Sequence, residues 1–416
     1  MVGNAVKNQQ TENLYSNVNK PIDTTNMVSN AMRQHLNDDF NEEDLPDGLY
    51  VQNIKTVAKV WRYTWSVNEE ILNIYKNAPE EQIYKPLLRF NITDVSNEYV
   101  STTDIHLKLD EKFEVYKVAY LAVFDRSGWK PVAFGVPDKD GQVAFNNIGK
   151  NILYLPAVYN QNECIPVGDP FVVEADGRIN YKSLNKDDKQ FMRLIRKFPL
   201  FGSIALFSQK LKGIRFEGAN SPTFNDAQLL HEVDYYPIDM IRVKINNPNK
   251  FRYLRCVSQN SGTDFAELKY LGKVDQDTVL LTGSPLILKV PGVRKRLEEK
   301  RLDRIKKLFD GDFMSLYGTD SAIDNWFGLD LGENKASQIT EIQFCAKTDA
   351  NFIIPGNQYE LYYWDDKWIF FDDKTAEDYF LEFDNVPSNG VYWLKCTTEG
   401  KEERAFTYGE KGQVWW

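Results

Sequence analysis

The sequence predicts an all-β protein of several domains, in which an antiparallel β-sandwich precedes two further sandwich domains. The chain has 416 residues, which is more than a single hydrophobic core usually serves. Aromatic residues make up 13% of the chain, and this share favours strands over helix bundles. Short segments of alternating apolar and polar residues are separated by Gly, Pro, Asn or Asp, which is typical of antiparallel sheets.

The first two stretches of the chain differ in composition. Residues 1–48 are rich in Asn, Gln, Asp and Thr, so we expect a polar leader, partly disordered, without a packed core. Regular apolar positions follow, and Ile105, Leu107 and Leu109 alternate with polar neighbours as in a strand with one buried face. We therefore predict a β-sandwich domain over residues 49–190.

Two short segments recur in the second half of the chain. Residues 214–219 align with residues 307–312, and residues 251–256 align with residues 391–396. Self-similarity within a chain is typical of a unit copied in tandem. In both copies of the second segment Leu and Cys share one strand face, which we interpret as a core face. A charged stretch with leucines between the copies predicts a solvated linker helix. The predicted copies occupy residues 191–290 and 291–416.

Charge and hydropathy limit the partners. The formal net charge is −10, whereas binding to phosphate backbones requires a clustered basic surface. We therefore expect neither nucleic acid nor an anionic membrane as a partner. No apolar stretch reaches the roughly 18–20 residues that span a bilayer, so no membrane insertion is expected. Residues 1–50 are largely polar, and no signal peptide is visible there.

The sequence favours binding over catalysis. Its 4 cysteines are too few for a disulfide scaffold and lack the paired spacing of a zinc site. We expect buried free thiols, with one bridge across a sandwich as the alternative. Apolar surroundings make a thiol a poor nucleophile, so we predict no catalytic residue. Paired carboxylates on turns are interpreted as solvated side chains, because a glycosidase needs two carboxyls across a cleft.

The second half of the chain resembles a known family. The resemblance rests on Phe-Asp-Gly-Asp at 309–312, on Trp-Phe-Gly-Leu-Asp-Leu-Gly at 326–332, and on the strand 251–256 followed by Phe-Ala-Glu-Leu at 265–268. These motifs resemble discoidin domains, also called factor-V/VIII C-type domains, which are galactose-binding-like jelly rolls. The resemblance implies that both predicted copies are discoidin-like jelly-roll β-sandwich domains. It also implies a carbohydrate-binding role.

A wider resemblance covers the upstream domain and the end of the chain. Lys-Val-Trp-Arg at 59–62, Ile-Leu-Tyr-Leu-Pro at 152–156, Gly-Lys-Glu-Glu-Arg at 400–404 and Gln-Val-Trp-Trp at 413–416 are similar to secreted gut-bacterial proteins. In those proteins a transglutaminase-like domain precedes a β-sandwich and discoidin-like modules. The resemblance implies an extracellular, periplasmic or cell-surface location. This chain departs from the pattern, because it has no cysteine before residue 59.

Three functions are therefore weighed. The first is a non-catalytic protein of glycan utilisation that binds a glycan or glycoprotein through jelly-roll loop ends. The alternative is a remnant or fragment of a transglutaminase-like Cys-His-Asp enzyme whose catalytic domain is missing here. A structural adhesion or docking module is the third.

The predicted ligand-binding residues lie in an aromatic run with an Asp-Asp turn. A Trp or Tyr ring stacks on the apolar face of a sugar, while neighbouring carboxylates accept hydrogen bonds from hydroxyl groups. Packing of the same rings within a hairpin is the alternative. The candidates are Tyr362, Trp364, Asp365, Asp366 and Trp368.

The resemblance also implies a structural Ca²⁺ ion. Discoidin-like domains often hold one between their first acidic turn and a late Glu, since Ca²⁺ prefers oxygen ligands. An acidic turn without a bound ion is the alternative. The positions that match are Asp310 and Asp312 with Glu402 or Glu403.

Overall fold

The computed structural model divides the chain into two compact units. The first unit comprises Met1–Met192, Tyr359–Lys374 and Glu382–Trp416, and the second comprises Arg193–Gln358 and Thr375–Leu381. In sequence, the second unit is thus inserted into the first. The polar leader predicted over residues 1–48 falls almost entirely outside the residues that the structure describes. These are residues 48–52, 59–67, 88–109, 113, 116–125, 128–160, 163–200, 202–258, 262–274, 276–288, 294–318, 326–399 and 403–416.

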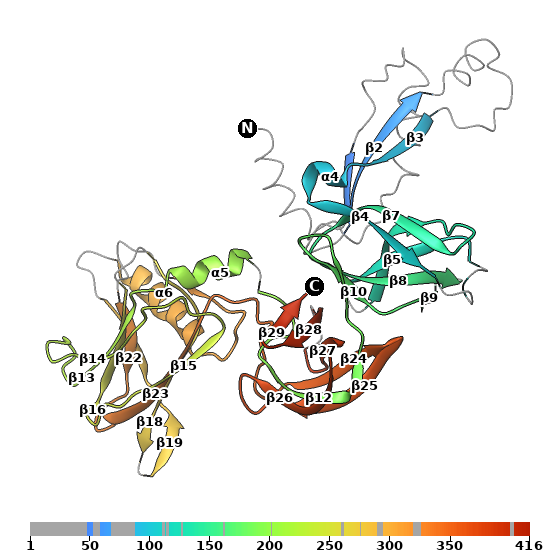
Figure 1. Ribbon diagram of the computed structural model, residues 1–416. Coiled ribbons are helices and arrows are strands. Elements are labelled where there is room, and N and C mark those ends of the chain that lie inside the picture. The colour runs from blue at the N-terminus through green and yellow to red at the C-terminus, as the bar shows by residue number, and fades with distance from the viewer. Residues whose placement is uncertain are drawn as a thin grey trace. The chain divides into compact units, whose positions relative to one another are not determined.

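The prediction of an all-β sandwich protein is confirmed (Figure 1). The strand pairs recorded within its sheets are antiparallel, as in the pairing of β5 with β6 and of β17 with β22. The predicted linker helix is present as α6. None of the helices in the described part of the chain is long and apolar enough to cross a bilayer. The helices are α4 (Ser96–Tyr99), α5 (Gly202–Gln209), α6 (Lys295–Ile305) and the 3-10 helix η3 (Lys306–Leu308).

The described residues in the upstream part of the first unit form three sheets. β1, β2 and β3 form one, β4 pairs with β7, and a six-stranded sheet has the order β11-β10-β8-β5-β6 with β9 joined to β8. The strands are β1 (Gly48–Gln52), β2 (Lys59–Val67), β3 (Leu88–Asp94), β4 (Thr102–Lys108), β5 (Ala119–Asp125), β6 (Gly128–Gly135), β7 (Gln142–Gly149), β8 (Ile152–Asn160), β9 (Glu163–Pro166), β10 (Phe171–Val173) and β11 (Ile179–Tyr181).

The six-stranded sheet is buried on both faces. On β8, Ile152 and Tyr154 face the core shared with β4 and β7. Leu153 and Leu155 alternate with them and belong to a second core, which includes Trp364 of the carboxyl-terminal sheet. Successive side chains of a strand point to opposite faces, so a strand between two cores is apolar at nearly every position. The sheet is therefore the middle layer of the first unit.

The carboxyl-terminal part of the first unit supplies the covering layer. A five-stranded sheet has the order β25-β24-β27-β28-β29, and β12 pairs with β26. On β27, Val391 and Trp393 face the second core, while the hydroxyl group of Tyr392 donates a hydrogen bond to the carbonyl of Pro387 on β26. The strands are β12 (Asn185–Leu194), β24 (Gln358–Asp365), β25 (Lys367–Thr375), β26 (Leu381–Ser388), β27 (Val391–Cys396), β28 (Ala405–Gly409) and β29 (Gly412–Trp415).

The second unit is a sandwich of two sheets. One sheet has the order β14-β13-β17-β22-β20, and the other contains β15, β23, β18 and β19, with β16 paired to β23 and β21 paired to β18. The strands are β13 (Arg215–Ala219), β14 (Gln228–Glu232), β15 (Met240–Lys244), β16 (Lys250–Phe251), β17 (Tyr253–Val257), β18 (Asp264–Val274), β19 (Asp277–Leu280), β20 (Ser284–Ile287), β21 (Tyr317–Gly318), β22 (Trp326–Asp330) and β23 (Ser337–Ala346).

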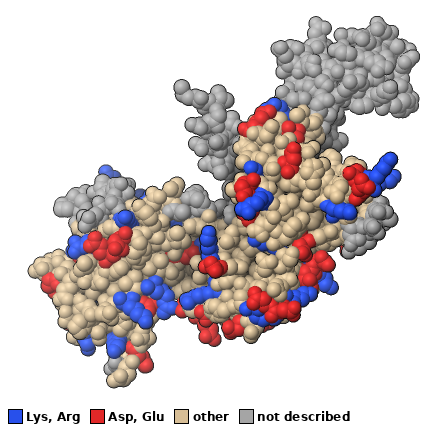
Figure 2. Space-filling model, viewed as in Figure 1, with Lys and Arg blue, Asp and Glu red and all other residues tan. Residues whose placement is uncertain are grey.

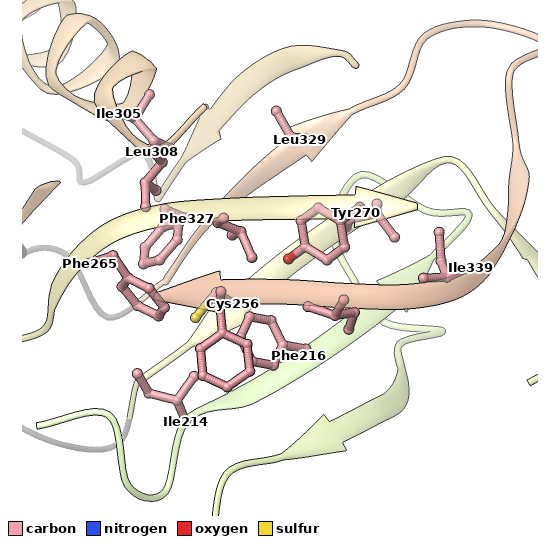
Figure 3. Close-up of a cluster of buried hydrophobic side chains, with 14 of the residues drawn as sticks. Ile214, Phe216, Cys256, Phe265, Tyr270, Ile305, Leu308, Phe327, Leu329 and Ile339 are labelled. Carbon is pink, nitrogen blue, oxygen red and sulfur yellow. The ribbon is translucent and has the colours of Figure 1, made fainter. Parts of the chain in front are cut away.

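One hydrophobic core lies between these two sheets (Figure 3). The ring centroids of Phe216 on β13 and Phe344 on β23 are 5.1 Å apart. Those of Phe327 on β22 and Phe265 on β18 are 5.5 Å apart. Cys256 is fully buried beside them, as its position on the predicted core face implies. The core is therefore formed by apolar side chains from both sheets.

The predicted boundary between residues 290 and 291 is wrong. Strands from both sides of it share both sheets, since β17 pairs with β22 and β18 pairs with β23. The first pair of aligned segments in the predicted repeat also adopts two different structures. Residues 215–219 form β13, whereas residues 306–308 form η3 and lead into a turn. A sandwich over the second unit and a separate carboxyl-terminal sheet therefore replace the two tandem copies.

Candidate functional site

The hairpin predicted to bind a ligand directs its rings into a buried aromatic cluster. Trp364 is 8% exposed, and its ring centroid lies 5.2 Å from those of Trp129 and Trp368. The ring of Trp368 lies 5.2 Å from that of Phe124. Tyr362 packs against the same cluster. Edge-to-face contacts of this kind stabilise packing, so these rings contact protein, as the packing alternative describes.

The two carboxylates of this hairpin lie at its turn. Asp366 has a φ of 57°, a left-handed conformation that Asp adopts more readily than most residues. Asp365 accepts a hydrogen bond from Nζ of Lys186 at 2.6 Å, and both side chains are exposed to solvent. The structure therefore places Asp365 and Asp366 at the surface, the ring of Trp364 in the core between two sheets, and the partly buried ring of Trp368 against that core.

The predicted calcium ligands are divided between the two units. Asp310 and Asp312 belong to the second unit, whereas Glu403 belongs to the first. The carboxylate of Glu403 accepts hydrogen bonds from Nε1 of Trp393 at 3.1 Å and from the backbone N–H of Cys396 at 2.9 Å. Glu402 lies outside the described residues. Within the described ranges, no three His, Cys, Asp or Glu side chains gather in a way that would hold a metal ion.

The acidic turn at residues 310–312 contacts the buried carboxyl group of Glu267. Oε2 of Glu267, a residue 1% exposed, accepts a hydrogen bond from the backbone N–H of Gly311 at 2.9 Å. Gly311 has a φ of 79°, which glycine adopts without strain. Burial raises the pKa of Glu267 to about 7, and the charge of Asp310 adds to this effect, while Lys269 and the Gly311 N–H oppose it. Glu267 therefore titrates near neutral pH in the folded chain.

Replacing Glu267 with glutamine is expected to remove a pH dependence of stability. The pKa of about 7 against a usual 4.5 corresponds to about 3 kcal/mol. The folded state binds the proton more tightly, so this contribution is full below about pH 4.5 and is lost as the pH rises to about 7. At about pH 8.5 the variant should be more stable than the natural chain. Urea denaturation at several pH values measures the difference, and parallel pH profiles would contradict the assignment.

The thiols show no sign of activation. Cys256, Cys345 and Cys396 are buried, Cys164 is partly buried, and all four are free. Burial raises the pKa of Cys164 above its usual value, although a hydrogen bond with Tyr159 opposes the rise. Burial also raises the pKa values of Cys256 and Cys345. A nucleophilic thiol requires a lowered pKa, so these groups favour a structural role.

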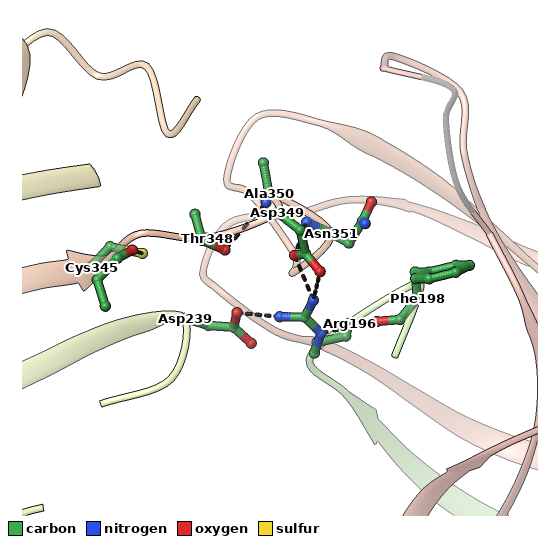
Figure 4. Close-up of polar contacts among 9 residues, drawn as sticks. Arg196, Phe198, Asp239, Cys345, Thr348, Asp349, Ala350 and Asn351 are labelled. Carbon is green, nitrogen blue, oxygen red and sulfur yellow. Dashed lines mark hydrogen bonds and ion pairs between the residues drawn. The ribbon is translucent and has the colours of Figure 1, made fainter. Parts of the chain in front are cut away.

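A buried ion cluster lies where the chain enters and leaves the sandwich of the second unit (Figure 4). The guanidinium of Arg196 binds both carboxylate oxygens of Asp349, at 2.6 and 2.8 Å, and also binds Asp239. Its Nε donates to the carbonyl of Phe198 at 2.9 Å. Arg196 and Phe352 form a β-bridge, which joins the entering and leaving segments. Every nitrogen of the guanidinium is engaged, so the arrangement fixes structure and offers no open ligand position.

An open groove of about 540 Å³ lies on the same sandwich. Small-molecule sites in proteins measure roughly 300–1,000 Å³, so the groove has room for one or two sugar rings. It follows β23 between the flanking strands β15 and β18. The lining consists of Lys244, Ile245, Asn246, Pro248, Lys273, Thr278, Gln338, Thr340 and Glu341.

Several polar groups in the groove are available to a ligand. Lys244, Asn246, Lys273 and Thr278 are exposed, and among the described residues their side chains form no recorded hydrogen bond or ion pair. Gln338 donates through Nε2 to the carbonyl of Asn247 at 3.1 Å, which leaves its side-chain oxygen to accept. The groove thus presents both donors and acceptors, the groups that hydroxyl-rich ligands require.

Sequence reasoning did not find this groove. Its residues come from three stretches that are far apart in the chain and carry no motif: β15 with the segment that follows it, β18 with β19, and β23. No family model, curated protein or solved structure matches the chain. Alternation along β23 indicates which side chains point outward, but it does not indicate which strands flank them. The groove is therefore formed by the pairing of β15 and β18 with β23, which the sequence alone does not indicate.

Proposed function

We propose that this chain is a non-catalytic carbohydrate-binding protein and that the groove along β23 is its saccharide site. The observation that carries the proposal is the set of exposed hydrogen-bonding side chains in the groove, most of which form no recorded hydrogen bond or ion pair within the described ranges. Sugar hydroxyl groups both donate and accept hydrogen bonds, and the amides of Asn246 and Gln338 with the hydroxyl of Thr278 complement them. The exposed side chain of Pro248 contributes contact with C–H groups.

Two further lines support binding over catalysis. The raised pKa values of Cys164, Cys256 and Cys345 disfavour the thiolate that a transglutaminase-like reaction needs. The motifs at 309–312 and 326–332 resemble discoidin-like domains, which are widely used in carbohydrate binding. On the basis of the same resemblance, we propose a location outside the cytoplasm, where glycans and glycoproteins occur.

Surface charge is consistent with this proposal. On the face drawn in Figure 2, basic and acidic side chains lie interspersed over the described parts of the chain. No continuous basic surface is seen among the described residues of that face, and binding to a phosphate backbone requires one.

Replacing both Asn246 and Gln338 with alanine is expected to weaken saccharide binding by at least about tenfold. A glycan array with the full chain identifies ligands, and isothermal titration calorimetry then gives dissociation constants. Gln142→Ala serves as the control, because Gln142 is exposed on β7 and lies outside the groove. Thermal unfolding confirms that both variants are folded. Absence of binding to any saccharide, or equal binding by the double variant and the natural chain, would contradict the proposal.

A further inference from the structure

The charge of the groove narrows the class of saccharide. Lys244 lies on β15 opposite Glu341 of β23, and Lys273 lies on β18 opposite Gln338. Because β15 and β18 flank β23, the two lysines stand on either side of the groove, about 10 Å apart across the sheet and offset along β23 by the three residues from Gln338 to Glu341. Among the described residues, neither ammonium group has an ion-pair partner.

The single carboxylate in the lining is paired with an arginine. Oε1 of Glu341 accepts hydrogen bonds from Nε of Arg242 at 2.8 Å and from Nε2 of Gln343 at 2.6 Å. Burial alone would raise the pKa of Glu341, but these hydrogen bonds hold it below the usual value. Arg242, which also binds Asp378 at 2.5 Å, therefore offsets part of the charge of Glu341, and the two ammonium groups of Lys244 and Lys273 outnumber the one carboxylate of the lining.

Neutral sugars most often stack on aromatic rings. No aromatic side chain lines this groove in the described structure, so such stacking is not offered there. Charge-assisted hydrogen bonds are roughly twice as strong as neutral ones, and lysine supplies them to carboxylate or sulfate oxygens. A groove of about 700 Å³ in the first unit is lined by Phe113, Tyr116 and three lysines, but its two aspartates form no recorded ion pair in the described chain and offset two of the lysine charges.

We propose that the groove selects acidic saccharides, whose carboxylate or sulfate groups are bound by Lys244 and Lys273 while their hydroxyl groups contact Asn246, Thr278 and Gln338. This inference rests on the proposed function and adds the ligand class to it. The ligand lies across β23, with its anionic group between the two strands that carry the lysines. The net charge of −10 for the whole chain limits the attraction of anionic ligands to the groove. We therefore do not extend the proposal to long polyanions.

The test compares three probes on the full chain by calorimetry. They are an unsulfated uronic-acid disaccharide, the same disaccharide with its carboxylate reduced to an alcohol, and a sulfated disaccharide. The uronic-acid probe or the sulfated probe should bind at least about tenfold more tightly than the reduced probe. The preference should fall as salt concentration rises. The carboxylate and sulfate probes show which anionic group the groove prefers.

Variants of Lys244 and Lys273 test whether these two side chains cause the preference for acidic probes. Lys244→Gln with Lys273→Gln should weaken binding of the acidic probe about tenfold and leave binding of the reduced probe nearly unchanged. Lys335→Gln is the matched control, because Lys335 is exposed on the same sandwich but does not line the groove. All three substitutions change exposed side chains, and thermal unfolding verifies the fold.

The outcomes separate this inference from the proposed function. Equal binding of the acidic and reduced probes overturns the acidic preference and leaves saccharide binding intact. Acidic binding that survives in the double lysine variant overturns the assignment to this groove. Failure of all three probes and of a neutral glycan array overturns both proposals. Binding of acidic phospholipid vesicles, without binding of the disaccharides, also overturns both, because the ligand is then a lipid surface.

Discussion

Replacing Arg196 with methionine is expected to lower the free energy of unfolding of the second unit by about 3–5 kcal/mol. The side chain of Arg196 is 7% exposed, and those of its partners Asp239 and Asp349 are 13% and 7% exposed. Removing the cation leaves two buried carboxylates without a counter-charge, and desolvated charges are strongly unfavourable. Chemical denaturation measures the loss, and amide hydrogen exchange localises it. Trp326 is a local fluorescence reporter of this unit.

Acid should partly rescue the Arg196 variant. Burial raises the pKa of Asp239, the charge of Asp349 adds to the rise, and Arg196 opposes it. Without Arg196 the pKa rises further, so protonation relieves the uncompensated charge and the deficit shrinks between about pH 7 and about pH 4. Arg242→Met is the control, since its side chain is 43% exposed and the expected loss is below about 1 kcal/mol. Equal losses in the two variants, or a deficit independent of pH, would contradict the role of Arg196.

Replacing Trp364 with alanine is expected to lower the free energy of unfolding of the first unit by about 3–5 kcal/mol. The ring is 8% exposed and contacts Trp129 and Trp368 edge to face. The substitution leaves a cavity between the six-stranded sheet and the carboxyl-terminal sheet, which the surrounding side chains fill only in part. Thermal and urea unfolding measure the loss. Saccharide affinity of the folded variant should equal that of the natural chain, because the proposed groove lies on other strands.

Phe370 provides the matched control on the same hairpin. Its side chain is 50% exposed, so Phe370→Ala should cost about 1 kcal/mol or less. A Trp364→Ala variant that keeps its stability but loses saccharide binding would contradict the packing role and restore the hairpin as the ligand site.

The motif at 326–332 shows how much the sequence can convey. Its residues have structural explanations: a Cβ atom on Gly328 would lie 1.9 Å from the carbonyl oxygen of Leu254, so only glycine fits there. Asp330 binds Nε of Arg252 at 2.8 Å and accepts from the N–H of Gly332 at 2.8 Å. Gly332 has a φ of 105°. Such backbone requirements leave a local signature, which is why strands and turns were predictable.

Strand partners left no such signature. Alternation placed Leu254 and Cys256 on a core face, and both are fully buried. It did not indicate that their strand pairs with β22, which lies beyond the predicted boundary. Similarly, Trp364 and Trp368 looked suitable for a sugar because local sequence does not show that β5 and β8 cover them. Pairings between distant segments depend on the whole fold, and so does the groove.

The two-sided burial of β8 has a consequence for synthesis on the ribosome. Leu153, Leu155 and Val172 belong to one core with Trp364 and Trp393, whose strands are translated only after Arg193–Gln358, the larger part of the second unit. At elongation rates of about 5–20 residues per second, the nascent sheet waits for roughly 10–40 s with one apolar face uncovered. A transcript truncated before residue 359 makes that exposure permanent. Such products should aggregate, so carboxyl-terminal nonsense changes should deplete the protein from the cell extract even though the upstream core is complete.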